Sequence, residues 1–377
     1  MKVVHLTTNY STGGASIACR RIVEAQRSVG IDASIVTMED VVADNVVSVT
    51  KSKFDKIRNF LFVALEKLFL LLIMKNRDEI FRFSTGFFGV DVTKYIKDAD
   101  VVHIHWINSF LSLRGIKKIK NKKVWTLHDT WGITGGCHLS LDCPIGDCKS
   151  CLYLDHKWLT SMLLKKKLNI LKDVELLAPS RKHCEKVSRS GLTCGVIPNP
   201  IKITDLPSKE ECRKELGLPC DKKIIAFGAY NTNQVSKGYD YVVDISDRFD
   251  ADIVVFGKQR TDNNFYDFGY VTSEEKLLKI LKASDVLVSP SVEETFGLIV
   301  CEAMSVGTPA VCFENTGTTD IIDHLENGYV AKFKDANDFA RGIQWCLDND
   351  LSQKAIDKVR SKFSYERVGN MFKEYYL

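Results

Sequence analysis

The chain of 377 residues has no stretch of about 18 uninterrupted apolar residues, so we expect no helix that spans a membrane. Its first residues, MKVVHLTTNYSTGG, lack the long apolar run and the small-residue cleavage site of a signal peptide. We therefore expect a cytoplasmic protein in which most of the 12 cysteines stay reduced. Low-complexity segments and solenoid repeats are also absent, which excludes disordered and repeat proteins.

Charge is distributed unevenly along the chain. Residues 1–200 contain 30 Lys and Arg against 19 Asp and Glu, whereas residues 201–377 contain 22 against 29, so the halves carry net charges of +11 and −7. This asymmetry favours two domains with different partners, as does a length that exceeds one ordinary core. The basic half suits nucleic acid, anionic lipid or a phosphorylated ligand.

Short apolar runs alternate with amphipathic stretches, which predict helices at 16–30 and 273–284. Because the runs are apolar along their whole length, they predict strands buried on both faces of a parallel sheet. The βαβα order occurs once in each half, which predicts an α/β protein with two doubly wound domains. The predicted strands are 2–8, 33–38, 101–106, 123–129, 175–180, 223–229, 252–257, 285–290 and 309–314.

A segment with three prolines and no helical periodicity, 196–211, separates the two halves. We therefore expect an N-terminal domain over 1–198 and a C-terminal domain over 199–362. The amphipathic segment 363–377 has an aromatic face and is expected to form a helix that packs back towards the N-terminal domain. Open α/β sheets bind ligands at the carboxyl ends of their strands, so the expected site is a cleft between the two domains.

Two segments join a predicted strand to a predicted helix in a way that suits ligand binding. In TTNYSTGGAS (7–16), Gly13 and Gly14 permit close backbone approach before a helix N-terminus, which suits a phosphate. The segment lacks both the GxGxxG and the P-loop pattern, so an ordinary tight turn is an equal alternative.

The second segment, PSVEETFGLIVCEAMSVGTPAV (290–311), places Glu294 in a loop and Glu302 one to two turns into a helix that begins near Gly297. Both carboxylates can accept hydrogen bonds from adjacent hydroxyls of a ribose or a hexose. The alternative is an acidic first turn that only complements the helix dipole. Backbone N–H groups at the helix start can hold a polar ligand; they belong to Phe296, Gly297 and Leu298.

Segment 290–311 resembles the E-x7-E signature of retaining glycosyltransferases of family 4 (glycosyl transferases group 1), which have the GT-B fold. Further segments resemble the family in the same order along nearly the whole chain: TGGAS, VWTLHDTW, SKGYDYV and NTGTTDII. The stretch after HDTWGITGGCH is similar to the colanic-acid subgroup, which builds bacterial exopolysaccharides, capsules and O-antigens. The resemblance implies two facing Rossmann-like domains with a cleft between them. It also implies transfer of a hexose from a nucleotide diphosphate sugar to a lipid-linked oligosaccharide, with retention of configuration.

The resemblance assigns roles to single residues. Glu302 would bind the ribose hydroxyls and Glu294 the hydroxyls of the transferred sugar. Lys237 and the backbone at Gly14 would bind the diphosphate, which removes the need for a catalytic divalent metal. His128 would lie beside the donor sugar at the reaction centre, while His103 and His105 in VVHIHW are more typical of structural histidines. The remaining donor contacts would come from the backbone at Phe296, Gly297, Leu298, Tyr270 and Val271.

The chain departs from the family near Lys237. Members usually add an arginine at one of two positions, which here hold Ala229 and Ser236. Lys258 and Arg260 are candidates for the missing cation. The glutamate that the family places in its late glycine loop is Asp320 here.

Four cysteines lie together in the insertion GGCHLSLDCPIGDCKSC (135–151), with only one C-x2-C pair. Structural zinc, free thiols and an iron–sulfur or redox role are open alternatives for Cys137, Cys143, Cys148 and Cys151. With LRGIKKIKNKK (113–123), the cysteines also support a zinc-bearing nucleic-acid module. That module would leave the second half unexplained, so we expect no nucleic-acid partner. A sugar-nucleotide epimerase on the same architecture is the other alternative.

The run FLFVALEKLFLLLIM (60–74), flanked by basic residues, predicts either a core helix or a helix on an anionic membrane surface. The second interpretation suits a polyprenyl-diphosphate-linked acceptor. We therefore expect peripheral association with the inner face of the plasma membrane.

Overall fold

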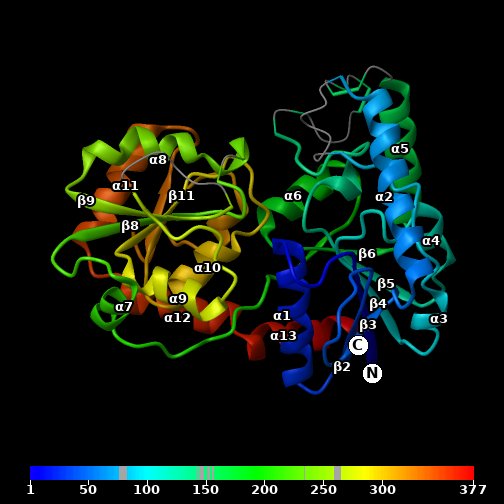
Figure 1. Cartoon of the computed structure of the whole chain (residues 1–377), viewed down its shortest axis with the longest axis horizontal. Coiled ribbons are helices and arrows are strands. Elements are labelled where there is room, and N and C mark those ends of the chain that lie inside the picture. The colour runs from blue at the N-terminus through cyan, green and yellow to red at the C-terminus, as the bar shows by residue number, and fades with distance from the viewer. Residues whose placement is uncertain are drawn as a thin grey trace. The chain divides into compact units, whose positions relative to one another are not determined.

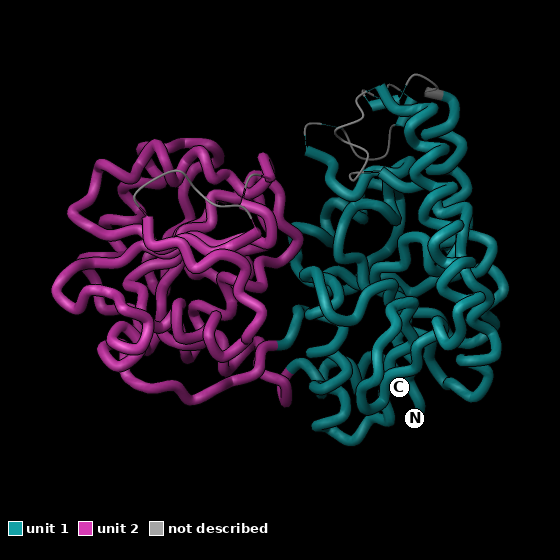
Figure 2. Tube along the Cα trace, viewed as in Figure 1, with its two compact units in different colours: residues 1–200, 368–377 teal, residues 201–367 magenta. Residues whose placement is uncertain are grey.

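The computed structural model describes residues 1–75, 83–141, 143, 148–149, 151, 153–154, 157–232, 234–258 and 265–377. The chain divides into two compact units (Figure 2). Unit 1 comprises residues 1–200 and 368–377, and unit 2 comprises residues 201–367. The unit boundaries thus lie close to the domain boundaries expected from the sequence, at 198/199 and 362/363.

Unit 1 contains a seven-stranded parallel sheet with the order β3-β2-β1-β4-β5-β6-β7. The five strands predicted for this half are confirmed, and the two edge strands that were not predicted are only three and two residues long. The strands are β1 (Lys2–Thr7), β2 (Asp32–Thr37), β3 (Val46–Ser48), β4 (Val101–Ile104), β5 (Lys122–Thr126), β6 (Glu175–Ala178) and β7 (Gly195–Val196). The helices are α1 (Gly14–Ser28), α2 (Lys53–Ile73), α3 (Thr93–Ile96), α4 (Leu113–Lys118), α5 (Lys157–Leu171), α6 (Arg181–Arg189) and α13 (Tyr365–Tyr376).

Two hydrophobic clusters cover the two faces of this sheet. Val4 and Leu6 of β1 face one cluster, which also contains residues of α3 and α4. Val3 faces the other, which contains Ile22 of α1 and Phe372 of α13. Helices from the two ends of the chain therefore cover the same face of the sheet, and Figure 1 shows them side by side.

Unit 2 contains a six-stranded parallel sheet with the order β10-β9-β8-β11-β12-β13. The strand order reverses between β8 and β11, so the loops after these two strands flank the position where open α/β sheets bind ligands. The strands are β8 (Lys223–Gly228), β9 (Ala251–Phe256), β10 (Tyr266–Asp267), β11 (Val286–Ser289), β12 (Ala310–Phe313) and β13 (Gly328–Ala331). The helices are α7 (Lys209–Leu216), α8 (Tyr239–Ile245), α9 (Glu274–Ala283), α10 (Leu298–Ser305), α11 (Ala336–Asp348) and α12 (Ser352–Phe363).

Candidate active site

The loops after β8 and β11 bring a cation and a carboxylate together in unit 2. Lys237, at the end of the 3-10 helix η3 (Val235–Lys237), places Nζ 2.6 Å from Oε2 of Glu294. Both side chains are partly buried, with 28% and 18% of their surfaces exposed, so solvent screens this pair less than a pair on the open surface. The structure therefore joins two of the three predicted catalytic residues, which are 57 positions apart in the sequence.

Glycines allow these loops to pack tightly against each other. Gly297 is the N-cap of α10 and has φ of 94°, and a Cβ atom there would lie 2.4 Å from Thr318. A Cβ on Gly238 would lie 2.1 Å from the carbonyl oxygen of Pro290, in the loop after β11. Since neither position has room for a side chain, glycine is needed for the loop after β11 to pack this closely against its neighbouring loops.

The predicted position of the E-x7-E helix is confirmed, because α10 begins at Leu298, directly after Gly297. Glu302 lies in this helix and is buried, with 5% of its surface exposed. Phe296 is also buried, in the core of unit 2, so its side chain supports the loop while its backbone borders the helix N-terminus. These positions suit the roles that the family resemblance assigns to the three residues.

A cluster of two tyrosines and a lysine lies at the end of β9 in unit 2. Nζ of Lys258 is 4.2 Å from the ring centroid of Tyr230 and 5.3 Å from that of Tyr270, and it also contacts the Tyr230 hydroxyl. The ammonium group is exposed at this edge, as a second phosphate cation requires. Val271 packs partly buried against the core, and Arg260 lies outside the described residues.

In unit 1, the glycine loop precedes α1 as predicted. Gly13 is the N-cap with φ of 95°, and Gly14 is the first residue of the helix. A Cβ atom at either position would meet nothing within 4 Å, so open space adjoins the helix N-terminus. The carboxylate of Glu39 holds the preceding loop by accepting hydrogen bonds from the backbone N–H groups of Tyr10 and Ser11 at 2.7 and 3.0 Å.

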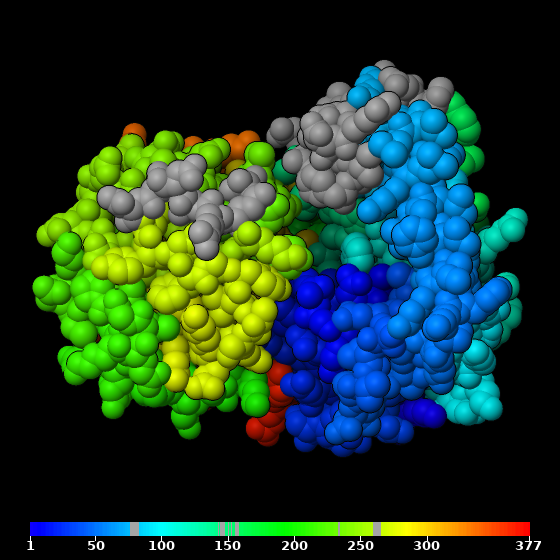
Figure 3. Space-filling view, in the orientation of Figure 1, coloured from blue at the N-terminus to red at the C-terminus, as the bar shows by residue number. Residues whose placement is uncertain are grey.

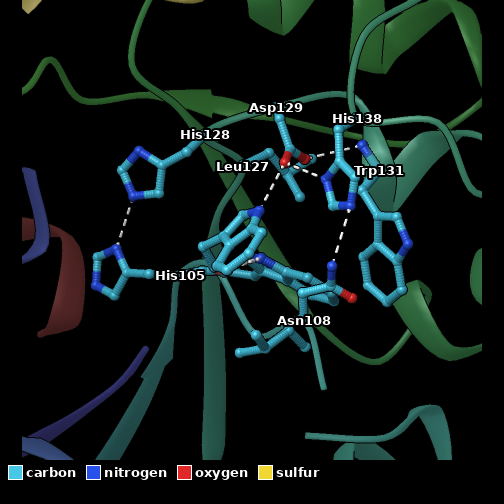
Figure 4. A pocket seen from close by; sticks show the side chains of 10 residues that line it. His105, Asn108, Leu127, His128, Asp129, Trp131 and His138 are labelled. Carbon is cyan, nitrogen blue, oxygen red and sulfur yellow. Dashed lines mark hydrogen bonds and ion pairs between the residues drawn. The ribbon is translucent and has the colours of Figure 1, made fainter. Parts of the chain in front are cut away.

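His128 lies just after β5 and lines a small pocket in unit 1 with aromatic and polar side chains (Figure 4). Next to it, Asp129 accepts a hydrogen bond from Trp106 Nε1 at 3.1 Å and lies 2.7 Å from His138 Nδ1. Burial alone would raise the pKa of Asp129, but the charge and hydrogen bond of His138 lower it below its ordinary value. The pocket thus contains the hydrogen-bonded pair Asp129–His138 beside His128, from residues that the sequence analysis did not assign to the site.

Burial lowers the pKa of His128 to about 4, although the nearby charge of Asp129 acts in the opposite direction. The imidazole is therefore neutral near pH 7. A neutral ring can donate one hydrogen bond and accept another, but it cannot supply a positive charge to a leaving group. In the described structure, Lys237 of unit 2 is better suited to that task.

The chain after this pocket is held by a buried lysine. Lys167 of α5 donates hydrogen bonds to the carbonyl oxygens of Trp131 and Thr134 at 2.8 and 3.2 Å. Its Nζ lies 3.7 Å from the centroid of the Trp131 ring, and burial lowers its pKa to about 7. Lys167 therefore connects α5 to the segment between His128 and the cysteine-rich insertion.

All four cysteines of the insertion lie within the described residues, and none of them forms a disulfide there. Burial raises the pKa of Cys137 to about 12, and the nearby thiols of Cys151, Cys148 and Cys143 act in the same direction. Cys137 and Cys151 pack in a small hydrophobic cluster with residues of α2 and α5. Structural zinc stays a prediction, and metal analysis of the purified protein tests it.

Comparisons with known proteins agree with this fold. Residues 208–363 match the family described as "Glycosyl transferases group 1". The putative colanic acid biosynthesis glycosyl transferase WcaC of Escherichia coli (strain K12) is 25% identical over 288 residues, which cover 69% of each chain. Sucrose-phosphate synthase from Thermosynechococcus elongatus superposes with a TM-score of 0.70 at 18% identity, over 100% of this chain and 98% of that one. Anabaena Alr3699/HepE, solved in complex with UDP-glucose, has a TM-score of 0.67 at 14% identity, with 100% and 99% covered.

The two parallel α/β sheets and these matches define the class of the protein: it is a glycosyltransferase with the GT-B fold. The match to the family Glycosyl transferases group 1 lies within unit 2 and runs from the N-cap of α7 to the end of α12. The fold class, the enzyme class and the family resemblance expected from the sequence are thereby confirmed.

Proposed function

We propose that the protein transfers a hexose from a nucleotide diphosphate sugar to a lipid-linked oligosaccharide, with retention of configuration, in the synthesis of a bacterial surface polysaccharide. The observation that carries this proposal is the Lys237–Glu294 pair, at the point where the strand order of unit 2 reverses. A nucleotide sugar carries both a diphosphate for the cation and sugar hydroxyls for the carboxylate. The UDP-glucose complex of the Anabaena neighbour and the similarity to WcaC support the donor and the pathway class.

In the proposed reaction, the protein supplies charge stabilisation and positioning. Lys237 leaves Glu294 and binds the diphosphate, where negative charge develops as the sugar departs. Glu294 then accepts hydrogen bonds from hydroxyls of the sugar, and Glu302 accepts those of the ribose. The phosphate of the donor takes the proton of the acceptor hydroxyl on the face that the leaving group vacates, so no residue is assigned as a nucleophile.

A lipid-linked acceptor is supported by helix α2, which buries two polar side chains and exposes eight large apolar side chains. Asn59 donates a hydrogen bond to Thr50 Oγ1 at 2.6 Å, and Glu66 accepts hydrogen bonds from the backbone N–H and the hydroxyl of Thr85. Both polar residues are buried against unit 1. The exposed residues of α2 are Phe54, Ile57, Phe60, Leu61, Leu65, Leu68, Leu71 and Leu72. The sequence left a core helix and a surface helix open, and this orientation favours the surface helix.

Helix α5 extends this apolar surface. It packs beside α2 through Leu70 of α2 and Leu163 of α5, and it exposes Trp158 and Met162. Figure 1 shows the two helices side by side, and Figure 3 shows α2 in light blue on the surface of unit 1. Soluble proteins rarely expose so many large apolar side chains on one helix without a partner. Exposed lysines border the surface, at Lys51, Lys53, Lys67 and Lys75. Within the described residues, none of the helices has the length and hydropathy needed to cross a bilayer.

These features support a helix that lies in the interface of an anionic membrane, where apolar side chains enter the lipid and lysines bind headgroups. Such contact would bring unit 1 to a polyprenyl-diphosphate-linked acceptor at the inner face of the plasma membrane. We call the exposed apolar residues of α2, with Trp158 and Met162, the apolar face of unit 1.

The donor is tested by measuring the thermal stability of the full chain with UDP-, GDP- and dTDP-hexoses. A bound donor raises the apparent stability by mass action, by about 2.7 kcal/mol at a hundredfold excess over Kd. We expect one nucleotide class to stabilise the protein. Stabilisation by none of them contradicts the proposal, and release of an epimerised sugar without acceptor points to the epimerase alternative.

A further inference from the structure

A line of buried side chains connects His128 to helix α1. Nε2 of His128 lies 2.8 Å from Nδ1 of His105, and Nε2 of His105 lies 2.8 Å from Nδ1 of His5. Nε2 of His5 lies 2.9 Å from Oε1 of Gln26, in α1. The strand register explains this alignment, since His5 of β1 pairs directly with His103 of β4, and His105 follows two positions later on the same face.

The line continues from Gln26 to the C-terminal helix. Nε2 of Gln26 donates to the hydroxyl of Tyr376 at 2.9 Å, and that hydroxyl lies 2.6 Å from Nδ1 of His103. Nε2 of His103 lies 2.8 Å from the hydroxyl of Thr126. We call this set the histidine line; its members are His128, His105, His5, Gln26, Tyr376, His103 and Thr126.

Three members of the line resemble a metal site at first inspection. His5, His103 and His105 bring ligating nitrogens within 4.8 Å of one another. Each of their six ring nitrogens, however, already lies within hydrogen-bond distance of a protein group. The rings of His103 and His105 also stack, with centroids 4.4 Å apart and planes at 26°, so their nitrogens do not converge on one ion. The arrangement is therefore a hydrogen-bonded line.

Burial keeps the histidines of the line uncharged. It lowers the pKa of His5 and of His128 to about 4, and it lowers the pKa of His103 and of His105 well below the ordinary value. A neutral imidazole has one proton, so it donates on one side and accepts on the other. All hydrogen bonds between Gln26 and His128 must therefore point in the same direction along the line. Only two arrangements of the ring protons meet this condition, and they are the reverse of each other.

The orientation of the Gln26 amide selects one of the two arrangements. Its nitrogen faces Tyr376, and its oxygen accepts from Nε2–H of His5. Nδ1 of His5 then accepts from Nε2–H of His105, whose Nδ1 accepts from Nε2–H of His128. We propose that Gln26 and Tyr376 are positioning residues, which act through His5 and His105 to fix His128 with its proton on Nε2 and a lone pair on Nδ1.

This tautomer determines what His128 offers to a ligand in the pocket of Figure 4. An unprotonated Nδ1 accepts a hydrogen bond from a hydroxyl, whereas the reversed line would present an N–H donor at the same place. In the part of this inference that rests on the proposed function, the hydroxyl belongs to the transferred sugar. The line therefore sets whether His128 accepts or donates a hydrogen bond towards that hydroxyl, and in this way it contributes to sugar specificity.

The direct test is ¹⁵N NMR of the histidine rings in the full-length protein without any ligand. Protonated and unprotonated ring nitrogens differ widely in chemical shift, and the signals of His128 are identified by their loss in His128→Asn. We expect a protonated Nε2 and an unprotonated Nδ1 at neutral pH. A protonated Nδ1 overturns the proposal.

A matched pair of variants tests the distant end of the line. Tyr376→Phe removes the hydroxyl that orients the Gln26 amide, so we expect a second set of His128 signals with the opposite protonation pattern. Tyr375→Phe, which removes the neighbouring hydroxyl outside the line, should leave one set. A single unchanged set in Tyr376→Phe shows that the tautomer does not depend on Gln26 and Tyr376, and it overturns their assigned role.

Kinetics then relate the line to catalysis. In Tyr376→Phe we expect kcat with the preferred donor to fall about threefold to tenfold, with KM little changed, since only part of the population has the competent tautomer. An unchanged kcat overturns the link to the reaction. Because the NMR measurement needs no substrate, failure of the transferase assay with the expected tautomer rejects the proposed function and leaves the tautomer assignment standing.

Discussion

The two candidate sites of this protein differ in how they are built. In unit 2, a charged pair with partly exposed side chains, Lys237–Glu294, comes from two loops at the strand-order reversal. In unit 1, neutral buried side chains connect His128 to residues as distant as Tyr376, near the end of the chain. The first arrangement suits binding of charge that develops during a reaction, and the second suits fixed orientation of a hydrogen bond. Charge stabilisation and hydrogen-bond orientation are therefore assigned to different units, and a substitution in one unit can disturb one task without the other.

The largest effect is expected from Lys237→Met. Loss of one group that stabilises transition-state charge typically costs about 3 kcal/mol, so kcat/KM should fall roughly 10²-fold to 10³-fold. The fold should persist because the side chain is partly exposed. Turnover of the donor found in the stability screen measures the effect. The matched control is Lys214→Ala, on exposed surface of α7, and a loss of less than threefold for Lys237→Met contradicts the assigned role.

A second effect is expected on the pH dependence of stability, and it concerns unit 1. His5, His103, His105 and His128 have folded-state pKa values below the ordinary 6.5, so the unfolded chain takes up protons first as the pH falls. The contribution of these neutral histidines to the free energy of unfolding is fully present above pH 6.5 and decreases as the pH falls towards 4. Within that pH range, each histidine can lower the free energy of unfolding by about 1.4 kcal/mol per pH unit.

This dependence is measured by urea unfolding at pH 7.5, 6.5 and 5.5, followed by tryptophan fluorescence. Four of the five tryptophans belong to unit 1, so the signal reports mainly on this unit. His103→Asn should reduce the slope of stability against pH. A stability that is flat from pH 7.5 to 5.5 contradicts the neutral, buried state of the line.

A smaller effect is expected from the apolar face of unit 1. Phe60 and Leu72 are 71% and 74% exposed, so Phe60→Ser and Leu72→Ser should not affect folding. Each should weaken binding to vesicles that contain anionic lipid by about tenfold, since about 1.4 kcal/mol of apolar burial is lost. Co-sedimentation measures this binding, with Val42→Ser, at an exposed site outside α2 and α5, as the control. Equal binding of all variants contradicts a membrane role for this face.

The smallest effect is expected from Lys258→Ala. The ammonium group is exposed beside Tyr230 and Tyr270, and an exposed cation contributes about 0.5–1 kcal/mol. If Lys258 replaces the arginine that family members place near Lys237, KM for the donor should rise twofold to fivefold at constant kcat. An unchanged KM removes Lys258 from the donor site.

The sequence alone was sufficient to predict the parts of the site whose residues lie close together in the chain. The E-x7-E segment predicted the start of α10 and the positions of Glu294 and Glu302, because glycine, strand and helix signals follow one another within a few residues. The strands β1, β2, β4, β5, β6, β8, β9, β11 and β12 were predictable from their apolar runs. The edge strands β3, β7, β10 and β13 were missed, because each has four residues or fewer and so carries too little periodicity to be recognised.

The unit 1 network was not predictable in the same way. VVHIHW places His103 and His105 on one face of a strand, but their partners come from β1, from the end of β5 and from α13, and only the fold brings these together. Tyr376 lies 350 positions from Gln26. Similarly, Asp129 was visible in the HDTW segment, yet its pairing with His138 depends on how the insertion folds back.

The central claim is that this chain is a retaining hexosyltransferase that uses a nucleotide diphosphate sugar. The most direct measurement follows turnover of UDP-, GDP- and dTDP-hexoses with a polyprenyl-diphosphate-linked acceptor, and determines the anomeric configuration of the new linkage by NMR. We predict that one donor is consumed and that the product keeps the configuration of the donor. An inverted linkage, or no turnover of any donor with or without acceptor, would contradict this account.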